Sequence, residues 1–161
     1  MGAYQKYYRI LYSLFAILSL SGVLWMHFQI PDQRIWSRNQ LLLLIGSVSG
    51  FTGLSIVLVC VRKYFFDLSG IDIFFKISAK DELQVGGLNK YVRHPLYAGT
   101  LLFVWSLFIM FPSVKNLISA CCISVYTVAG TILEEKKLTK KFGNAYTSYA
   151  AGVAMLIPGV F

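Results

Sequence analysis

Long apolar blocks separated by short polar segments run along most of this chain. Four blocks can be drawn, at residues 10–28, 41–61, 96–111 and 117–133. Their apolar residues are contiguous and do not recur on one helical face only, which is the pattern that a lipid bilayer selects. At about 1.5 Å per residue, the first two blocks can cross a hydrocarbon core of about 30 Å, and the last two fall a few ångströms short. The pattern predicts an all-α integral membrane protein with about four transmembrane helices.

The polar segments predict further helices at the membrane surface. Residues 64–90 mix phenylalanines with charges, so we expect an interfacial helix followed by a loop. The fourth helix should continue beyond the membrane and stop at Gly143, and a short helix should follow over residues 144–151. The apolar tail, residues 152–161, is too short to cross a bilayer and should fold back or lie at the interface.

The positive charges suggest an orientation. The chain has 161 residues, 57% of them hydrophobic, and a formal net charge of +8. If the N-terminus is cytosolic, the alternation of four spans leaves twelve Lys and Arg residues inside and only Arg34, Arg38 and Lys115 outside. This asymmetry predicts a multi-pass protein with both termini in the cytosol, in the inner membrane if the cell is bacterial. Because the charges flank the apolar blocks and are not interleaved with exposed aromatics, we expect no nucleic-acid partner.

The small residues of the apolar blocks favour packing over chemistry. Cys60, Cys121 and Cys122 lie within apolar blocks without a CxxC motif, so we expect small buried residues and neither a disulfide framework nor a metal site. Gly46, Gly50 and Gly53 are spaced i, i+4, i+7 in the second block. This stripe predicts that another helix approaches closely there.

A basic and an acidic pair should meet at the cytosolic boundary. Arg93 and His94 precede a proline at the start of the third block, and Glu134 and Glu135 follow the fourth block. If the hairpin between these helices turns near Ser113, His94 lies 19 residues before the turn and Glu134 lies 21 residues after it. The two pairs are therefore expected at nearly the same depth on the same side.

These residues also belong to a longer pattern. The stretch Arg93-His94-Pro95-x-Tyr97 resembles that of the isoprenylcysteine carboxyl methyltransferase and phospholipid N-methyltransferase group. The match continues, over about residues 79–159 in all, through Glu134-Glu135-x-x-Leu138, Phe142-Gly143, Tyr146, Tyr149 and Ile157-Pro158. The resemblance implies methyl transfer from S-adenosylmethionine on the cytosolic side, to a lipid-like or prenylated acceptor from the membrane. We accordingly interpret residues 1–161 as one membrane domain, with residues 1–78 supplying spans and residues 79–161 the cofactor site.

The resemblance also implies roles for individual side chains. Arg93 and Glu134 are the expected catalytic residues. Arg93 would hold a carboxylate with its rigid fork, and Glu134 or Glu135 would accept from an ammonium group or from ribose hydroxyls. Glu134 would take a proton if the acceptor is an amine. Tyrosine ring faces suit a sulfonium or an adenine. The expected cofactor-binding residues are Val92, Arg93, His94, Tyr97, Glu134, Glu135, Tyr146 and Tyr149, with no metal.

Two other functions are compatible with the same residues. Taken singly, these side chains could be a basic flank, a charged helix surface and an interfacial aromatic belt. A non-catalytic membrane adaptor or lipid-binding protein, or an NADPH-dependent membrane reductase, would then remain possible. Two glutamates at a membrane boundary are nevertheless costly unless something is bound to or paired with them, which favours the methyltransferase interpretation. The methyl acceptor and the oligomeric state stay open.

Overall fold

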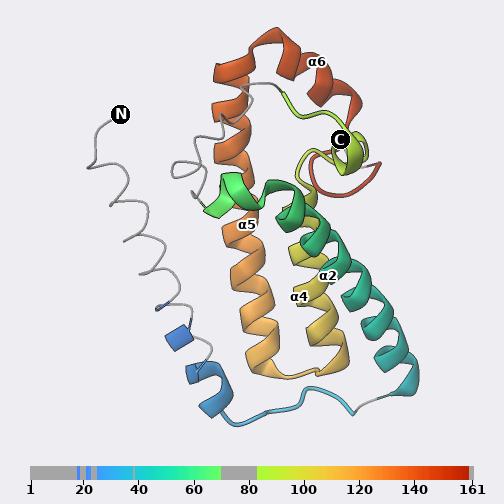
Figure 1. The fold of residues 1–161 in the computed structure, drawn as a ribbon. Helices are drawn as coiled ribbons and strands as arrows, with labels where there is room; N and C mark the ends of the chain where they lie inside the picture. Colours follow the sequence, from blue (N-terminus) through green and yellow to red (C-terminus); the bar gives the residue numbers. More distant parts are fainter. Residues whose placement is uncertain (1–17, 19–20, 23–24, 38, 70–82, 160–161) are drawn as a thin grey trace.

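Helices make up the regular structure of the computed structural model, which describes residues 18, 21–22, 25–37, 39–69 and 83–159, the side chains of residues 63–69 excepted. The main helices are α2 (Gln40–Ser69), α4 (Pro95–Met110), α5 (Val114–Phe142) and α6 (Asn144–Gly152), and the 3-10 helix η1 (Gly87–Lys90) precedes α4. In these ranges β pairing is limited to two isolated bridges. Helices α2, α4 and α5 lie side by side, and α5 projects beyond them to carry α6 (Figure 1). The predicted all-α fold is confirmed for this part of the chain.

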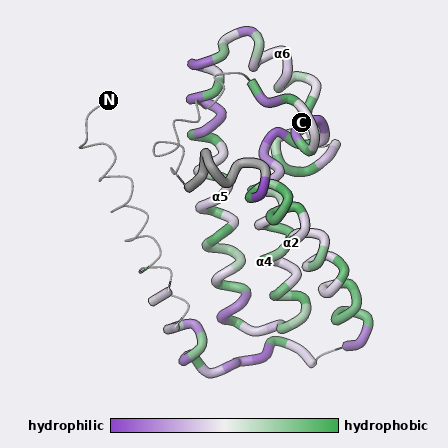
Figure 2. Tube along the Cα trace, viewed as in Figure 1, coloured by the Kyte–Doolittle hydropathy of each residue, from purple (hydrophilic) through white to green (hydrophobic). Residues whose placement is uncertain are grey.

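The apolar surface of the bundle fits a membrane environment. Residues Gln40–Arg62 of α2 and Val114–Phe142 of α5 form two helices long and apolar enough to cross a bilayer, and α4 is a shorter apolar helix. In each of these two long helices, 17% of an apolar 18-residue stretch is buried inside the protein. The core helix of a soluble protein would be mostly buried. Figure 2 shows the hydrophobic residues along the lengths of α2, α4 and α5, with hydrophilic residues where α5 projects and along the segment before α2 at the opposite end.

The first apolar block, at residues 10–28, lies mostly outside the described residues. The count of four spans and the cytosolic position of both termini therefore stay predictions.

Most helix boundaries match the sequence-based expectations. Pro95 is the first residue of α4, and α5 ends at Phe142, where Gly143 adopts a positive φ of 55° and α6 begins at the next residue. At the other end of α5, Ser113 accepts a hydrogen bond from the backbone N–H of Asn116, so it caps the helix as Ser residues do. One boundary differs: α2 runs to Ser69 without a break, so no separate interfacial helix begins at residue 64.

The glycine stripe of α2 packs against α4, as predicted. Gly46, Gly50 and Gly53 all face α4 so closely that an added Cβ would lie under 3.0 Å from an atom of that helix. A substitution would be least tolerated at Gly53. A Cβ added there would lie 2.7 Å from the Phe103 backbone nitrogen and 2.8 Å from the Gly99 carbonyl oxygen. Backbone atoms cannot rotate away, so only glycine permits this approach.

We expect Gly53→Ala to destabilise the protein by about 1–3 kcal/mol, because the methyl group forces α2 and α4 apart. Gly130→Ala in α5 is the matched control, since a Cβ there would meet nothing within 4 Å. Thermal unfolding in detergent, followed by circular dichroism, measures both. Equal melting temperatures for the two variants would show that the helices can separate without cost.

The cysteines follow the expectation only in part. Cys60 on α2 is buried, but Cys121 and Cys122 on α5 are exposed. The prediction that all three are buried was wrong for these two. An apolar block does not say which of its faces points toward another helix and which toward lipid. None of the three forms a disulfide in the described structure, and the described residues contain no cluster of metal-ligating side chains.

The segment before α2 closes the end of the bundle opposite α6 (Figure 1). Its backbone pairs with the turn between α4 and α5: Ile35 N–H donates to the Pro112 carbonyl at 2.8 Å, and Val114 N–H donates to the Gln33 carbonyl at 3.0 Å. The His27 ring nitrogen Nε2 lies 3.1 Å from Oδ1 of Asn116 in α5. These contacts hold the turn between α4 and α5 in place. The turn lies far from the candidate site residues that were predicted from the sequence.

Candidate active site

The tail of the chain folds back onto the segment that precedes α4. Val92 and Ala154 form a parallel bridge. The Arg93 N–H donates to the Ala154 carbonyl at 2.8 Å, and the His94 N–H donates to the Met155 carbonyl at 3.2 Å. The predicted return of the tail is therefore confirmed for the residues around 154. The returning tail thus contacts the Arg93-His94 part of the motif, which lies about sixty residues earlier in the sequence.

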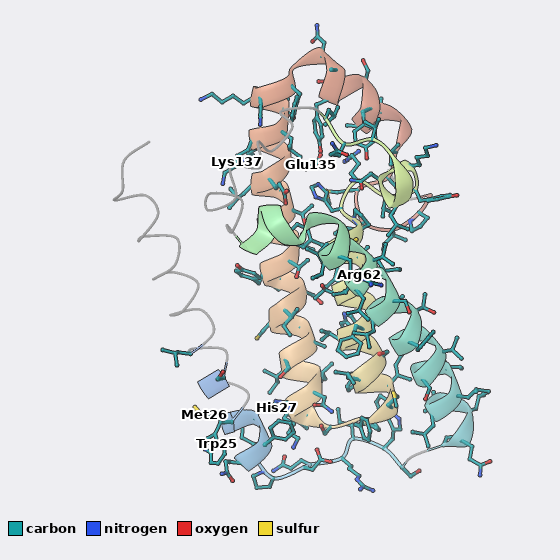
Figure 3. The ribbon with its side chains drawn as sticks, viewed as in Figure 1. Trp25, Met26, His27, Arg62, Glu135 and Lys137 are labelled. Atoms are coloured by element: carbon teal, nitrogen blue, oxygen red, sulfur yellow. The ribbon has the colours of Figure 1, made fainter. Side chains whose placement is uncertain are left out.

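One carboxylate oxygen lies at the centre of this junction. Oε1 of Glu135 accepts hydrogen bonds from Arg93 Nε at 3.0 Å, from His94 Nε2 at 2.7 Å and from the Tyr146 hydroxyl at 2.5 Å. In Figure 3, Glu135 and Lys137 lie on opposite sides of α5, with Glu135 on the side toward the C-terminal segment. Because its partners come from the segment before α4 and from α6, Glu135 ties three parts of the chain together.

Arg93 completes this network at the end of α6. Its Nη1 donates to the carbonyls of Ala150 at 2.6 Å and Val153 at 2.7 Å. The last carbonyls of a helix have no partner within it, and here a partly buried cation satisfies them. The Arg93 side chain is 13% exposed. Two of its three nitrogens are thus occupied by the protein itself, which makes Arg93 a cross-link between α5 and α6.

Glu134 has a different environment although it is adjacent in sequence. Its side chain is 43% exposed, against 21% for Glu135. Its Oε2 lies 3.7 Å from His94 Nδ1. The Tyr97 ring stacks on the His94 ring with centroids 5.7 Å apart and an interplanar angle of 22°. Glu134 therefore keeps room for another partner.

A cavity of about 420 Å³ opens beside Glu134. Its walls come from α2, the loop before η1, the start of α4, the end of α5 and α6. The described residues that line it are Cys60, Leu83, Gln84, Asn89, Arg93, His94, Pro95, Leu96, Tyr97, Glu134, Leu138, Lys141, Phe142, Tyr146 and Tyr149. The expected meeting of the basic and acidic pairs is thus confirmed, with a cavity between the two helix ends.

Tyr146 and Tyr149 of α6 form one wall of the cavity. Their rings meet edge to face, with centroids 6.0 Å apart at 61°. Tyr149 donates from its hydroxyl to the Asn89 carbonyl at 2.6 Å. Burial, together with the hydrogen bond to Glu135, raises the pKa of Tyr146 far above its ordinary value near 10. The Tyr146 phenol therefore stays protonated at neutral pH and remains a donor to Glu135.

The structure brings together the residues predicted from the sequence and divides them into two groups. Arg93, His94, Tyr97, Glu134, Tyr146 and Tyr149 line the cavity, whereas Val92 and Glu135 are not among its described lining residues. Val92 is buried against the tail, and Glu135 holds its neighbours in place. Sequence reasoning missed Cys60, Asn89 and Lys141 as lining residues. Asn89 lies within the motif region and could have been noticed, but Cys60 comes from a block that carries no motif.

A family model for phospholipid methyltransferases matches residues 42–145. The chain belongs to this family. The matched region contains α4 and both glutamates. It therefore includes the part of the cavity wall that α4 and α5 form. The predicted resemblance to isoprenylcysteine and phospholipid methyltransferases is confirmed.

Relatives of known name extend the comparison. The chain is 34% identical over 160 residues to a methanethiol S-methyltransferase of Crocosphaera subtropica, covering 93% of this chain and 60% of that protein. It is 31% identical over 163 residues to a methanethiol S-methyltransferase of Pseudomonas deceptionensis, covering 94% of this chain and 60% of that protein. The chain thus spans about 60% of the length of these family members. No solved structure matches it.

Proposed function

We propose that this protein transfers a methyl group from S-adenosylmethionine to a small apolar thiol at the membrane boundary. The observation that carries the proposal is the cavity beside Glu134, which places a partly exposed carboxylate and aromatic rings at the end of apolar helices. Membership of the phospholipid methyltransferase family and the names of the relatives support methyl transfer.

The lining of the cavity has the chemistry that S-adenosylmethionine needs. The Glu134 carboxylate can accept from an ammonium group or from ribose hydroxyls through a charge-assisted hydrogen bond. The ring faces of Tyr97 and Tyr149 suit a sulfonium or an adenine. Lys141 and Arg93 both line the cavity and bring positive charge for a carboxylate, although Nε and Nη1 of Arg93 already bind the protein. The residues present therefore fit this cofactor.

S-adenosylmethionine supplies an electrophilic methyl group carried by a sulfonium. The chain's own part is to hold the acceptor in line with that group and to exclude water, which can provide most of the acceleration of a displacement reaction. The thiol's S–CH₃ bond forms as the sulfonium–CH₃ bond breaks, and the thiol proton must leave. We assign the removal of this proton to Glu134, which is the catalytic role expected from the sequence.

The arrangement around His94 offers that proton a second position. Because His94 Nε2 lies 2.7 Å from a carboxylate oxygen of Glu135, this nitrogen is the donor. In the neutral imidazole the other nitrogen, Nδ1, is then an acceptor. It lies 3.7 Å from Oε2 of Glu134. A proton taken by Glu134 can pass to His94 only after the two side chains approach to hydrogen-bond distance.

The comparisons change the expected class of methyl acceptor. The resemblance of the motif pointed to a lipid-like or prenylated acceptor. The named relatives are methanethiol S-methyltransferases, which favours a small thiol instead. A phospholipid amine remains the second candidate because of the family's name. The positive-inside pattern supports a cytosolic cavity.

The decisive experiment joins cofactor binding to product identification. Calorimetry on the detergent-solubilised protein should detect binding of S-adenosylmethionine, and incubation with methyl-labelled cofactor and an alkanethiol should yield a labelled thioether. Phosphatidylethanolamine and a prenylcysteine serve as competing acceptors. Labelled phospholipid without labelled thioether would replace the thiol by a lipid acceptor.

The same preparation tests the two other functions. Binding of NADPH in place of S-adenosylmethionine would indicate a reductase. Failure to bind either cofactor would leave a membrane adaptor or lipid-binding protein and would end the methyltransferase proposal.

A further inference from the structure

A second depression lies on α5, outside the lining of the cavity described above. It is an open groove of about 520 Å³, lined by Ile132, Glu135, Lys136, Thr139, Lys140 and Met155. The four α5 positions other than Glu135 are spaced i, i+4, i+7, i+8, so they share one face of the helix. Met155, from the returning tail, forms the opposite wall. The proposed methyl transfer uses none of these residues except Glu135, which acts there only through its neighbours.

The groove changes character along its length. Ile132 is 45% exposed and lies one helical turn before Lys136, on the apolar part of α5. Lys136 and Lys140 are exposed on the projecting part. Among the described residues no salt bridge involves either lysine. One end of the groove is therefore apolar, and the other end carries two ammonium groups. If the apolar part of α5 spans the bilayer, these ends would lie at the levels of the acyl chains and of the headgroups.

Glu135, the one acid among the described lining residues of the groove, does not cancel this charge. Oε1 of Glu135 is already bound to Arg93, His94 and Tyr146, and its salt bridge with Arg93 neutralises it locally. Lysines near the end of a helix also complement its dipole, which explains their sign. The dipole does not explain why two of them border a groove whose other end is apolar.

We propose that this groove binds an anionic phospholipid, with the headgroup phosphate between Lys136 and Lys140 and an acyl chain along Ile132 and Met155. Each lysine near a membrane surface strengthens the attraction to an anionic lipid about fivefold, so the pair gives about 25-fold over a zwitterionic lipid. The lipid is a bound ligand and not the methyl acceptor. Since Glu135 lines this groove and also holds Arg93 and His94, a bound lipid would contact the network that supports the cavity.

Native mass spectrometry of the full chain, released from detergent micelles, tests this proposal. The protein is titrated with dioleoyl-phosphatidylglycerol or with dioleoyl-phosphatidylcholine. We expect one phosphatidylglycerol to bind about 25-fold more tightly than phosphatidylcholine, and Lys136→Gln/Lys140→Gln to lose most of this preference. Equal binding of the two lipids to the unmodified protein would overturn the proposal.

A charge-matched control separates the groove from general basicity. Arg62→Gln/Lys137→Gln removes two exposed cations that are not among the described lining residues of the groove, and Lys137 points away from Glu135 (Figure 3). This variant should keep the preference within about twofold. An equal loss in both variants would mean that no specific groove exists.

A soluble anion distinguishes the two sources of a phosphate. Glycerol phosphate at millimolar concentration should fail to displace phosphatidylglycerol, because it lacks the chain that occupies the apolar end. Full displacement would mean a site for free phosphate and would refute the lipid assignment. All three measurements read lipid binding, so they stand or fall independently of methyl transfer.

Discussion

Replacing Glu135 with alanine is expected to destabilise the protein by about 2–4 kcal/mol and to abolish cofactor binding. Removing one partner of a buried ion pair leaves the other charge without compensation, which typically costs about 3–5 kcal/mol. Here Arg93 and Glu135 are 13% and 21% exposed, so solvent screening lowers this cost to about 2–4 kcal/mol. The His94 and Tyr146 hydrogen bonds to the same oxygen are lost as well. Denaturant unfolding in detergent measures the change in stability.

The part of the chain that becomes accessible to protease distinguishes the loss of the Glu135 contacts from a general loss of packing. Without Glu135, α6 and the tail lose their link to α5, so limited proteolysis should cleave after Gly143 much faster than in the unmodified protein. Glu135→Gln keeps an acceptor oxygen but not the charge, and should fall between the two. Normal stability and normal proteolysis for Glu135→Ala would show that the three hydrogen bonds to Oε1 contribute little.

Replacing Glu134 with glutamine is expected to have the opposite profile: a stable protein that binds S-adenosylmethionine about 10- to 100-fold more weakly. A hydrogen bond to a charged group contributes about 1.5–3 kcal/mol, which corresponds to that range of affinity. Stability should change by less than about 0.5 kcal/mol, since the side chain is 43% exposed. Glutamine also cannot accept the acceptor's proton, so kcat should fall in addition.

The two adjacent variants control each other. Calorimetry gives the affinity for S-adenosylmethionine, thermal unfolding gives the stability, and labelled product gives kcat. The assignment of Glu134 to the cavity requires that it lose affinity without losing stability. If Glu134→Gln bound the cofactor normally and turned it over at the normal rate, the carboxylate in the cavity would have no part in the reaction.

The depth at which the motifs meet could be predicted from the sequence because it depends on simple helix geometry. Counting residues from a turn near Ser113 brings His94 and Glu134 to one level, and the hairpin has that turn. Pro95 and Gly143 marked helix ends through backbone properties that do not depend on tertiary packing. The glycine stripe predicted a close helix neighbour for the same reason.

The division of labour between the two glutamates could not be predicted. Consecutive helix positions point about 100° apart, but the sequence does not say which direction meets α6 and which meets the cavity. Arg93 illustrates the same limit, because its contacts with the Ala150 and Val153 carbonyls depend on how the tail returns. The exposure of Cys121 and Cys122 likewise follows from the rotation of α5 about its axis, which an uninterrupted apolar block leaves undetermined.

The unbroken course of α5 sets the height of the cavity in the bilayer. Glu134 lies twenty residues after Val114, which is about 30 Å along the helix and equals the thickness of the hydrocarbon core. With Val114 at one boundary, the carboxylate stands at the other, level with the first polar groups of the lipids. Under the proposed function, an apolar acceptor dissolved among the acyl chains would reach it without passing through water. Its effective concentration at the cavity would follow its oil–water partition coefficient, so the lipid phase would act as the substrate reservoir.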